Sequence, residues 1–521
     1  MPSTPLPLLR TFAELLSWRQ QLTQPGPLHF VPTMGALHVG HQHLIRRAAR
    51  PRGDQFPSVL VSVFVNPLQF GAGEDFARYP RDLERDAELA AQAGAAVLWA
   101  PGLADIYPRG ASETTRLLPP LALTRGLCGA SRPGHFEGVA TVVARLLALV
   151  QPQRLFLGEK DWQQLQVLRR MVDDLGLAVV IEAVGTVREA SGLACSSRNR
   201  YLDAQQHRQA LALPQALAAA CRAVAAGQRA AAPLVDLVQQ QLKAAGLMVD
   251  YVELVAPHTL EPLQQLEGPA LLAVAAACGP ARLIDHTVLM TRAPIVAIDG
   301  PAGAGKSTVT KAFARRLGLV YLDTGAMYRA LTWWVQQQGV DAADAAAVAP
   351  LLGGLDLQLG ADQSVTINGH DVTTAIRSPE VTALVSTVAA HACVREALTA
   401  QQQAMGQRGG LVAEGRDIGT AVFPDAEFKV FLTATVAERA RRRALDLAQR
   451  GFAVPDLSEL EAQIAERDHR DSTRAIAPLL QAADAIELIT DGMGIDAVID
   501  QLVDLFRRRV PEDAWPPPAE G

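Results

Sequence analysis

A glycine-rich segment near the middle of the chain constrains the fold more than any other feature of the sequence. Residues 300–308 match the phosphate-loop pattern G-x-x-x-x-G-K-[ST] in full. The apolar run 295–299 precedes this loop as a buried strand would, and residues 309–317 follow it with helical character. The loop backbone and the N-terminus of the next helix can together hold a polyphosphate. We therefore expect a nucleotide-binding α/β domain that opens near residue 294.

Individual residues of the loop predict contacts with a nucleoside triphosphate. Gly300 and Gly305 let backbone N–H groups curl around the phosphates. Lys306 would reach the terminal phosphates, and the Ser307 hydroxyl would bind Mg²⁺. The alternative is a glycine-rich turn without a ligand.

Almost 300 residues precede this domain, so a chain of 521 residues implies a second function. The net charge is −6, and the sequence has no long basic tract, so we expect no nucleic-acid partner. None of the five cysteines falls in a C-x-x-C pair, which favours reduced thiols and a cytoplasmic protein. We see no secretory signal at the N-terminus and no apolar run long enough to span a membrane, so we expect no membrane partner.

The first half alternates strand-like and helical patterns. Strands are expected at residues 28–33, 59–65 and 95–100, with a helix at 82–92. Repeated strand–helix units predict a parallel sheet whose ligands bind at the carboxyl ends of the strands. We expect a Rossmann-like domain in residues 1–186, a smaller α+β domain in 187–287, a phosphate-loop domain in 294–508 and a disordered tail in 509–521.

Two shorter patterns refine this division. In residues 187–287, a helical stretch at 204–245 is followed by strand-like runs at 250–255 and 270–278. The phosphate-loop domain is expected to carry a substrate-binding insert at about 355–400, in which short apolar runs around Asn368-Gly369 predict a β-hairpin.

His38 and His41 stand three residues apart at the expected start of a helix, and this spacing places them on one face. The positive end of a helix disfavours protonation, so neutral imidazoles could donate hydrogen bonds to phosphate. Metal binding is a second interpretation, although the loop offers no obvious third ligand. Two surface histidines without a function are the third.

Several blocks in order resemble pantothenate synthetase (pantoate–β-alanine ligase), a family of H-x-G-H nucleotidyltransferases. The resemblance covers about residues 8–287. It rests on the blocks Pro32-Thr-Met-Gly-Ala-Leu-His-Val-Gly-His41, Phe64-Val-Asn-Pro-Leu-Gln-Phe70, Tyr79-Pro-Arg-Asp82, Arg132-Pro-Gly-His-Phe136, Gly158-Glu-Lys-Asp-Trp-Gln-Gln-Leu165 and Ser196-Ser-Arg-Asn199.

The resemblance implies that ATP and pantoate form pantoyl-adenylate, from which β-alanine displaces AMP. It makes His41 a proton donor, with His38, Lys160 and Arg198 as further catalytic groups. It also implies that Gln69 and Gln164 bind pantoate and β-alanine. The implied ATP site comprises Met34, Gly35, His38, Gly40, His41, Gly158, Glu159, Lys160, Asp161, Val187, Cys195, Ser196, Ser197 and Arg198. Cys195 and Trp162 depart from the residues expected there, but neither is a charged motif residue.

The second half is similar to bacterial cytidylate kinase, which transfers the γ-phosphoryl group of MgATP to CMP or dCMP. The similarity rests on Leu322-Asp-Thr-Gly-Ala-Met-Tyr-Arg329, Ala413-Glu-Gly-Arg-Asp-Ile-Gly419 and Glu466-Arg-Asp-His-Arg-Asp-Ser-Thr-Arg474. The implied ATP site comprises Gly300, Gly303, Gly305, Lys306, Ser307 and Thr308, with Ser307 on the metal. The implied CMP site comprises Thr324, Arg329, Ser386, Arg395, Arg416, Asp417, Arg467, Asp471 and Arg474.

Within that site, Arg329 and Arg416 would grip the acceptor phosphate and Asp471 the ribose. Asp417 would accept from the cytosine amino group, beside Arg395 and Ser386. Glu414 could hold Mg²⁺ through water.

The sequence therefore predicts a bifunctional enzyme that uses ATP and Mg²⁺, with a homodimer implied through the first half. The alternatives are a non-catalytic, nucleotide-binding first half and a general pyrimidine monophosphate kinase.

Overall fold

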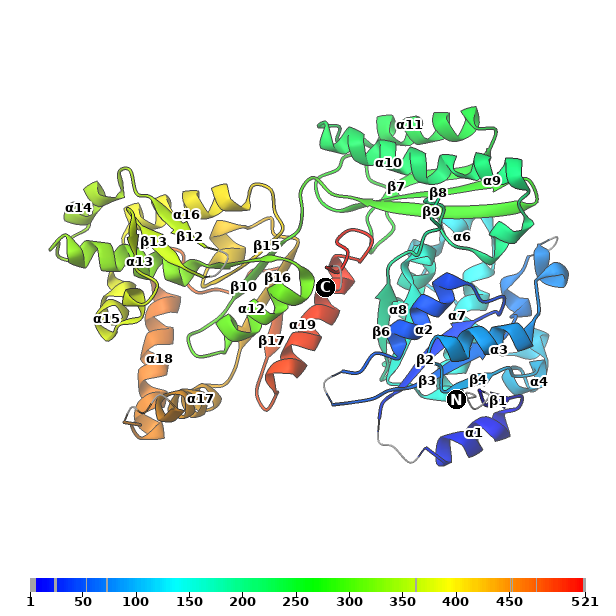
Figure 1. Ribbon diagram of the computed structural model, residues 1–521, viewed down its shortest axis with the longest axis horizontal. Helices are drawn as coiled ribbons and strands as arrows, with labels where there is room; N and C mark the ends of the chain where they lie inside the picture. Colours follow the sequence, from blue (N-terminus) through cyan, green and yellow to red (C-terminus); the bar gives the residue numbers. More distant parts are fainter. Residues whose placement is uncertain are drawn as a thin grey trace. The chain divides into compact units, whose positions relative to one another are not determined.

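The computed structural model describes residues 6–22, 26–52, 54–71, 74–360, 363–449, 451, 453–474 and 476–518. The chain forms two compact units, each of which has its own sheets and core (Figure 1). Unit 1 comprises Met1–Thr291 and Pro511–Pro516, and unit 2 comprises Arg292–Val510 and Pro517–Gly521.

Unit 1 is built on a parallel sheet with strand order β1-β4-β3-β2-β5-β6. Its strands are β1 (Leu8–Leu9), β2 (Leu28–Thr33), β3 (Ser58–Val63), β4 (Val97–Trp99), β5 (Arg154–Gly158) and β6 (Val180–Val184). The strands expected near residues 28, 59 and 95 are confirmed as β2, β3 and β4. The helices around this sheet are α1 (Phe12–Gln20), α2 (Val39–Ala48), α3 (Leu83–Gln92), α4 (Leu103–Ile106), α5 (Leu121–Thr124), α6 (Leu127–Ser131), α7 (His135–Val150) and α8 (Trp162–Asp174).

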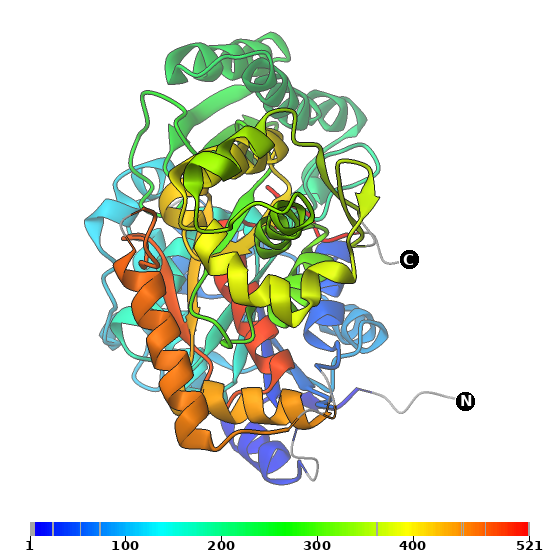
Figure 2. The same cartoon turned by 90° about the vertical axis from the view of Figure 1, so that its left-hand side faces the viewer.

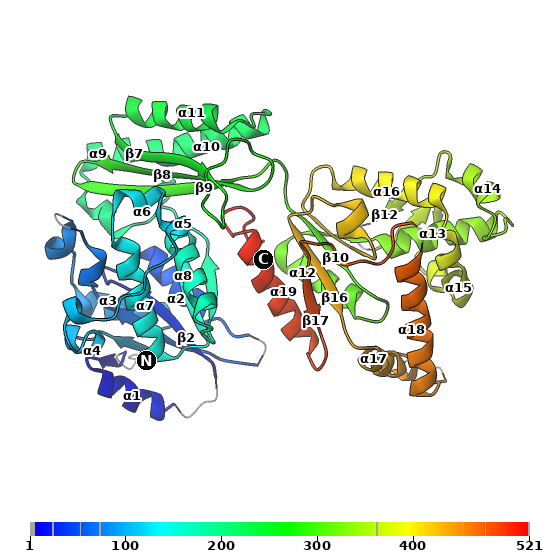
Figure 3. The same cartoon turned by 180° about the vertical axis from the view of Figure 1, so that it is seen from behind.

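A three-stranded antiparallel sheet, β7-β8-β9, forms the second part of unit 1. Helices α10 and α11 cover one face of it, and α6 contacts the other (Figure 3). Its elements are α9 (Ala204–Ala210), α10 (Ala212–Ala225), α11 (Ala231–Ala244), β7 (Met248–Val255), β8 (Ala270–Cys278) and β9 (Ala281–Leu289). Only β7 and β8 were expected from the sequence, because Arg282, Asp285 and His286 interrupt the apolar pattern of β9.

Unit 2 is built on a parallel sheet with order β11-β15-β10-β16-β17, in which β10, the strand before the phosphate loop, is central. Its strands are β10 (Ile295–Asp299), β11 (Val320–Asp323), β15 (Leu411–Gly415), β16 (Phe428–Thr433) and β17 (Ile486–Ile489). The expected strand–loop–helix arrangement is confirmed, since α12 begins at Lys306, directly after the loop.

Helices surround this sheet, and α17 packs against α18 (Figure 2). They are α12 (Lys306–Leu317), α13 (Thr324–Gln337), α14 (Ala345–Val348), α15 (Pro379–Val388), α16 (Ala392–Gly406), α17 (Val436–Gln449), α18 (Leu457–Thr473) and α19 (Ile495–Arg509). The hairpin around Asn368-Gly369 is confirmed as an antiparallel pair within a small sheet of β12 (Leu357–Leu359), β13 (Val365–Ile367) and β14 (His370–Asp371).

The expectation of a disordered tail is wrong for most of residues 509–521. Helix α19 continues to Arg509, Val510 is 1% exposed, and residues 511–516 pack into unit 1. Buried carboxylates and backbone hydrogen bonds hold this segment, although its composition resembles that of a linker. Residues 519–521 lie outside the described part of the chain.

Among the described residues, no single helix has the length and apolar character needed to cross a membrane. One pair of helices, α15 and α16, passes that test of length and composition together, with a bend of 99° between them.

Candidate active sites

A cavity of about 270 Å³ in unit 1 brings together most of the residues that the sequence assigned to the first nucleotide site. It lies at the carboxyl ends of β2, β5 and β6, where a parallel sheet places its ligands. The predicted residues that line it are Met34, His38, Gly40, His41, Gln69, Gly158, Lys160, Asp161, Gln164, Val187, Cys195, Ser196, Ser197 and Arg198. Gly35 and Glu159 do not line it.

The two histidines of this cavity stand at the start of α2. His38 is the N-cap residue, and its Nδ1 accepts a hydrogen bond from the Gly40 N–H at 3.1 Å. The backbone N–H of His38 donates to Nδ1 of His41 at 3.4 Å. Since Nδ1 is an acceptor in both rings, the neutral form of each ring carries its proton on Nε2.

Burial keeps both rings neutral. It lowers the pKa of His38 to about 4, with a further contribution from the nearby charges of Lys160 and Arg200. Burial also lowers the pKa of His41 well below its ordinary value, helped by His38 and Lys160. The helix therefore presents two neutral Nε2–H donors. Among the described residues, no group of three His, Cys, Asp or Glu side chains is placed to hold a metal ion.

Other contacts fix further residues that line the cavity. Arg198 donates to the Asp75 carboxylate through Nε at 3.2 Å and a terminal nitrogen at 3.0 Å. The Tyr79 hydroxyl lies 3.4 Å from the Ser197 hydroxyl. Arg198 is thus held in place by a carboxylate of the 3-10 helical turn Asp75–Arg78, which is remote in the sequence.

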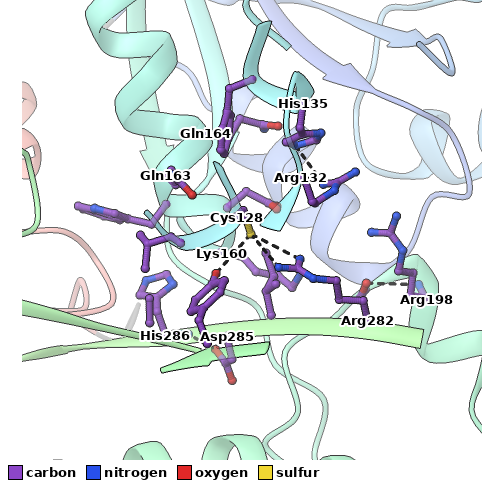
Figure 4. A pocket seen from close by; sticks show the side chains of 18 of the residues that line it. Cys128, Arg132, His135, Lys160, Gln163, Gln164, Arg198, Arg282, Asp285 and His286 are labelled. Carbon is purple, nitrogen blue, oxygen red and sulfur yellow. Dashed lines mark hydrogen bonds between the residues drawn. The ribbon is translucent and has the colours of Figure 1, made fainter. Parts of the chain in front are cut away.

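A second cavity of about 210 Å³ adjoins the first and shares Lys160, Gln164 and Arg198 with it (Figure 4). Arg132 and His135 also line both cavities, although the sequence assigned them no role. Their motif block, residues 132–136, was the signal that could have found them. Arg132 donates to the Glu74 carboxylate at 2.6 Å, and His135 Nδ1 lies 2.9 Å from the Gln69 carbonyl oxygen.

A cavity of about 900 Å³ in unit 2 brings together the second predicted site. The predicted residues that line it are Gly303, Gly305, Lys306, Ser307, Thr308, Thr324, Arg329, Ser386, Arg395, Arg416, Asp417, Arg467, Asp471 and Arg474. Gly300 does not line it and instead lies against β16, where a Cβ atom would come within 2.0 Å of the Leu432 carbonyl oxygen. The pattern therefore requires glycine at position 300 for close backbone packing.

Lys306 is almost fully buried at the start of α12. Its Nζ donates to the carbonyl oxygens of Gly300 at 2.7 Å and Pro301 at 2.8 Å. Burial, together with the charge of Arg416, lowers its pKa well below the ordinary value. The ammonium group lies inside the loop that would surround a polyphosphate.

Oxygen atoms of Ser307 and Glu414 meet beside Lys306. The Ser307 hydroxyl donates to Glu414 Oε1 at 2.5 Å, and the Tyr321 hydroxyl donates to the same oxygen at 2.9 Å. The other oxygen, Glu414 Oε2, is buried without a hydrogen-bond partner among the described residues. Burial, followed by the charge of Asp323, raises the pKa of Glu414.

Several arginines of this cavity are paired with carboxylates. Arg329 contacts Asp323 at 3.3 Å, and Arg416 contacts Asp471 at 3.0 Å. The buried guanidinium of Arg395 donates to Asp417 and also lies over the ring of Tyr328, 5.5 Å from its centroid. Asp323 and Tyr328 were not assigned to the site, although both stand in the motif block 322–329.

Comparison with known proteins agrees with this division of the chain. Residues 7–288 match the family model of pantoate-beta-alanine ligase, and residues 296–508 match that of cytidylate kinase. A "Bifunctional pantoate ligase/cytidylate kinase" of Parasynechococcus marenigrum is 65% identical and aligns over 98% of this chain and 100% of its own length. A protein of the same description from Prochlorococcus marinus is 63% identical and aligns over 96% of this chain and 99% of its own length.

A solved structure supports the fold of the first half. The crystal structure of pantothenate synthetase from Thermus thermophilus is 47% identical, with a TM-score of 0.50, and covers 54% of this chain and 98% of its own. A family match over more than half of the chain and relatives above 60% identity along nearly its whole length decide the assignment. The chain belongs to the family of bifunctional pantoate ligase/cytidylate kinases, enzymes that join a pantoate–β-alanine ligase to a cytidylate kinase.

Proposed function

We propose that the cavity of unit 1 forms pantoyl-adenylate from pantoate and ATP, with loss of pyrophosphate, and that β-alanine then displaces AMP. The carrying observation is the pair of neutral Nε2–H donors of His38 and His41 in the cavity that Lys160 and Arg198 also line. Attack of a carboxylate on the α-phosphorus gathers negative charge, and donors and cations that converge there stabilise the transition state.

The remaining roles in this site follow from position. Gln69 and Gln164 would bind pantoate, because amide groups both donate to and accept from a hydroxy acid. Val187 would meet the adenine through its backbone. Gly35 and Glu159 would act from outside the cavity, by shaping the backbone that lines it.

In unit 2, we propose that the γ-phosphoryl group of ATP passes to CMP or dCMP. Lys306 would bind the terminal phosphates, and Arg329 and Arg416 the acceptor phosphate, which the planar guanidinium fits. Asp417 would accept from the cytosine amino group. Asp471 would bind the ribose, Ser386 and Arg395 would approach the base, and Arg467 and Arg474 would belong to a closing lid.

The residues beside the phosphate loop fit Mg²⁺. The Ser307 hydroxyl and the carboxylate of Glu414, with its unpartnered oxygen, are the hard oxygen ligands that this ion prefers. Mg²⁺ usually keeps several waters and binds through one or two carboxylates plus substrate phosphates, so it needs no larger protein cluster. The ion would neutralise charge on the transferred phosphoryl group.

We also propose a cytoplasmic homodimer that associates through the ligase half. The five cysteines are free thiols, which suits a reducing compartment. Analytical ultracentrifugation of the full chain and of a chain of residues 292–518 would compare their oligomeric states. Only the full chain should sediment as a dimer.

An exchange reaction tests the adenylate directly. With pantoate but no β-alanine, the wild-type chain should exchange labelled pyrophosphate into ATP, because adenylate formation is reversible. The exchange should require pantoate and should vanish in His41→Ala. A chain that forms pantothenate without such exchange would contradict the adenylate route.

A further inference from the structure

Six residues that interrupt unit 2 near the C-terminus are packed into unit 1. Residues 511–516, here called the C-terminal segment, belong to unit 1, although they follow Val510 of unit 2 directly. Glu512 is 6% exposed, and Ala514 packs against the apolar core of unit 1. This segment is therefore a structural part of the ligase half.

The carboxylate of Glu159 holds the backbone of the segment. The N–H of Glu512 donates to Oε1 of Glu159 at 2.9 Å, and the N–H of Asp513 donates to Oε2 at 2.8 Å. Glu159 itself is fully buried. Glu159 opens the turn Glu159–Asp161, and the other two residues of this turn, Lys160 and Asp161, line the nucleotide cavity. The segment thus contacts this turn at the one of its three residues that does not line the cavity.

The side chains of the segment hold a second loop of the same cavity. Asp513 accepts from the Thr186 N–H at 2.8 Å and the Thr186 hydroxyl at 2.5 Å. Glu512 accepts from the Gly185 N–H at 3.1 Å and from Arg47 at 2.8 Å. Gly185 and Thr186 line the cavity and lead into Val187, the residue proposed to meet adenine.

An ion pair completes the attachment. Nε2 of His286, which is labelled in Figure 4, lies 3.3 Å from the Asp513 carboxylate. Burial alone would lower the pKa of His286, but Asp513 outweighs it and raises the pKa. Burial would likewise raise the pKa of Asp513, but the interaction with His286 lowers it. Both shifts favour the charged pair.

We propose that the C-terminal segment positions the ATP-binding loops of the ligase, so that this active site is complete only with residues from the end of the chain. The proposal rests on the proposed function, since it assigns ATP to this cavity. The segment contacts Glu159, the first residue of the turn whose Lys160 and Asp161 line the cavity. It also contacts Gly185 and Thr186, which lead into Val187. Glu512 and Asp513 act as positioning residues, because they contact the loops rather than the reacting atoms.

Kinetics of Asp513→Ala in the full chain test this role. The variant loses two hydrogen bonds to a charged acceptor, so the ligase KM for ATP should rise at least about tenfold. The KM values for pantoate and β-alanine and the rate of CMP phosphorylation should stay at wild-type values. Asp496→Ala, which removes an exposed carboxylate on α19, is the matched control and should change none of these. A lower thermal stability with an unchanged KM for ATP would overturn the proposal, because it would leave the segment a purely structural role.

Truncation after Val510 provides a second test that does not depend on one side chain. The shortened chain should phosphorylate CMP normally but show a raised ligase KM for ATP, and an added peptide of residues 511–521 should lower it again. An unchanged KM, or a ligase that the peptide does not restore, would overturn the proposal. If the wild-type chain formed no pantothenate, the proposed function would fail instead, so the two failures are distinguishable.

Discussion

The guanidinium of Arg395 donates a hydrogen bond to the carboxylate of Asp417 inside the nucleotide cavity of unit 2. Arg395 is 4% exposed and Asp417 is 6% exposed, so neither charge is screened by bulk water. Arg474 lies 3.6 Å from the other carboxylate oxygen. The pair places an acceptor and a donor side by side, which is the pattern that the amino group and the ring acceptors of cytosine require.

Asp417→Asn should therefore make the kinase less selective for CMP over UMP. UMP would turn a carbonyl oxygen toward the carboxylate, and such a mismatch can reduce kcat/KM by about 10⁴ in a site built for hydrogen bonding. An asparagine amide can donate to that carbonyl, so the ratio of kcat/KM for CMP to that for UMP should fall at least about tenfold. Equal values for both bases in the wild type would instead favour a general pyrimidine kinase.

The pH dependence of the ligase follows from the lowered pKa values of His38 and His41. With the pKa of His38 at about 4, its ring is neutral above about pH 5, and burial lowers the pKa of His41 well below its ordinary value as well. The kcat/KM for ATP should therefore show no inflection from His38 or His41 near pH 6.5, and protonation of His38 should lower it as the pH approaches 4. A clear inflection near pH 6.5 that is absent from His38→Gln would contradict this account.

The same shift has a consequence for stability. Between pH 4 and 6.5 the unfolded chain binds a proton at His38 that the folded chain does not bind, so acidification through this window lowers the free energy of unfolding of unit 1.

Gly40→Ala should impair the ligase through the position of His38. A Cβ atom at residue 40 would lie 2.9 Å from Cε1 and 3.0 Å from Nδ1 of the His38 ring, so the ring must move. The rate of pantothenate formation should fall about tenfold or more, as for a misplaced oxyanion donor, while CMP phosphorylation is retained. Gly268→Ala is the matched control, because a Cβ there meets open space. Wild-type ligase activity of Gly40→Ala would contradict the proposed role of the His38 ring.

The sequence predicted best those features that are local in the chain. The apolar run 295–299 and the loop after it predicted β10 and α12 because strand, turn and helix signals follow one another directly. The two histidines three residues apart were correctly placed on one face at the start of α2, where their rings lie 4.1 Å apart. Motif blocks also identified most of the residues that line both cavities.

Features that depend on distant partners were not predictable in this way. The segment Pro511–Pro516 has the composition of a disordered tail, and its contacts with Glu159 and Thr186, more than 300 positions earlier, hold it in place. The pairing of Arg198 with Asp75 likewise joins residues 123 positions apart. Periodicity and spacing report on neighbours along the chain, whereas these contacts exist only after the sheets have brought remote loops together.

The central claim is that one chain carries two separate active sites, and paired variants of the full chain test it most directly. Pantothenate formed from ATP, pantoate and β-alanine, and CDP formed from ATP and CMP, would be quantified by mass in His41→Ala and Lys306→Ala. Loss of one charge-stabilising group typically lowers a rate a hundredfold or more, roughly 3 kcal/mol. We predict that His41→Ala loses pantothenate formation and keeps CDP formation, and that Lys306→Ala does the reverse. Loss of both activities in either folded variant would contradict the claim.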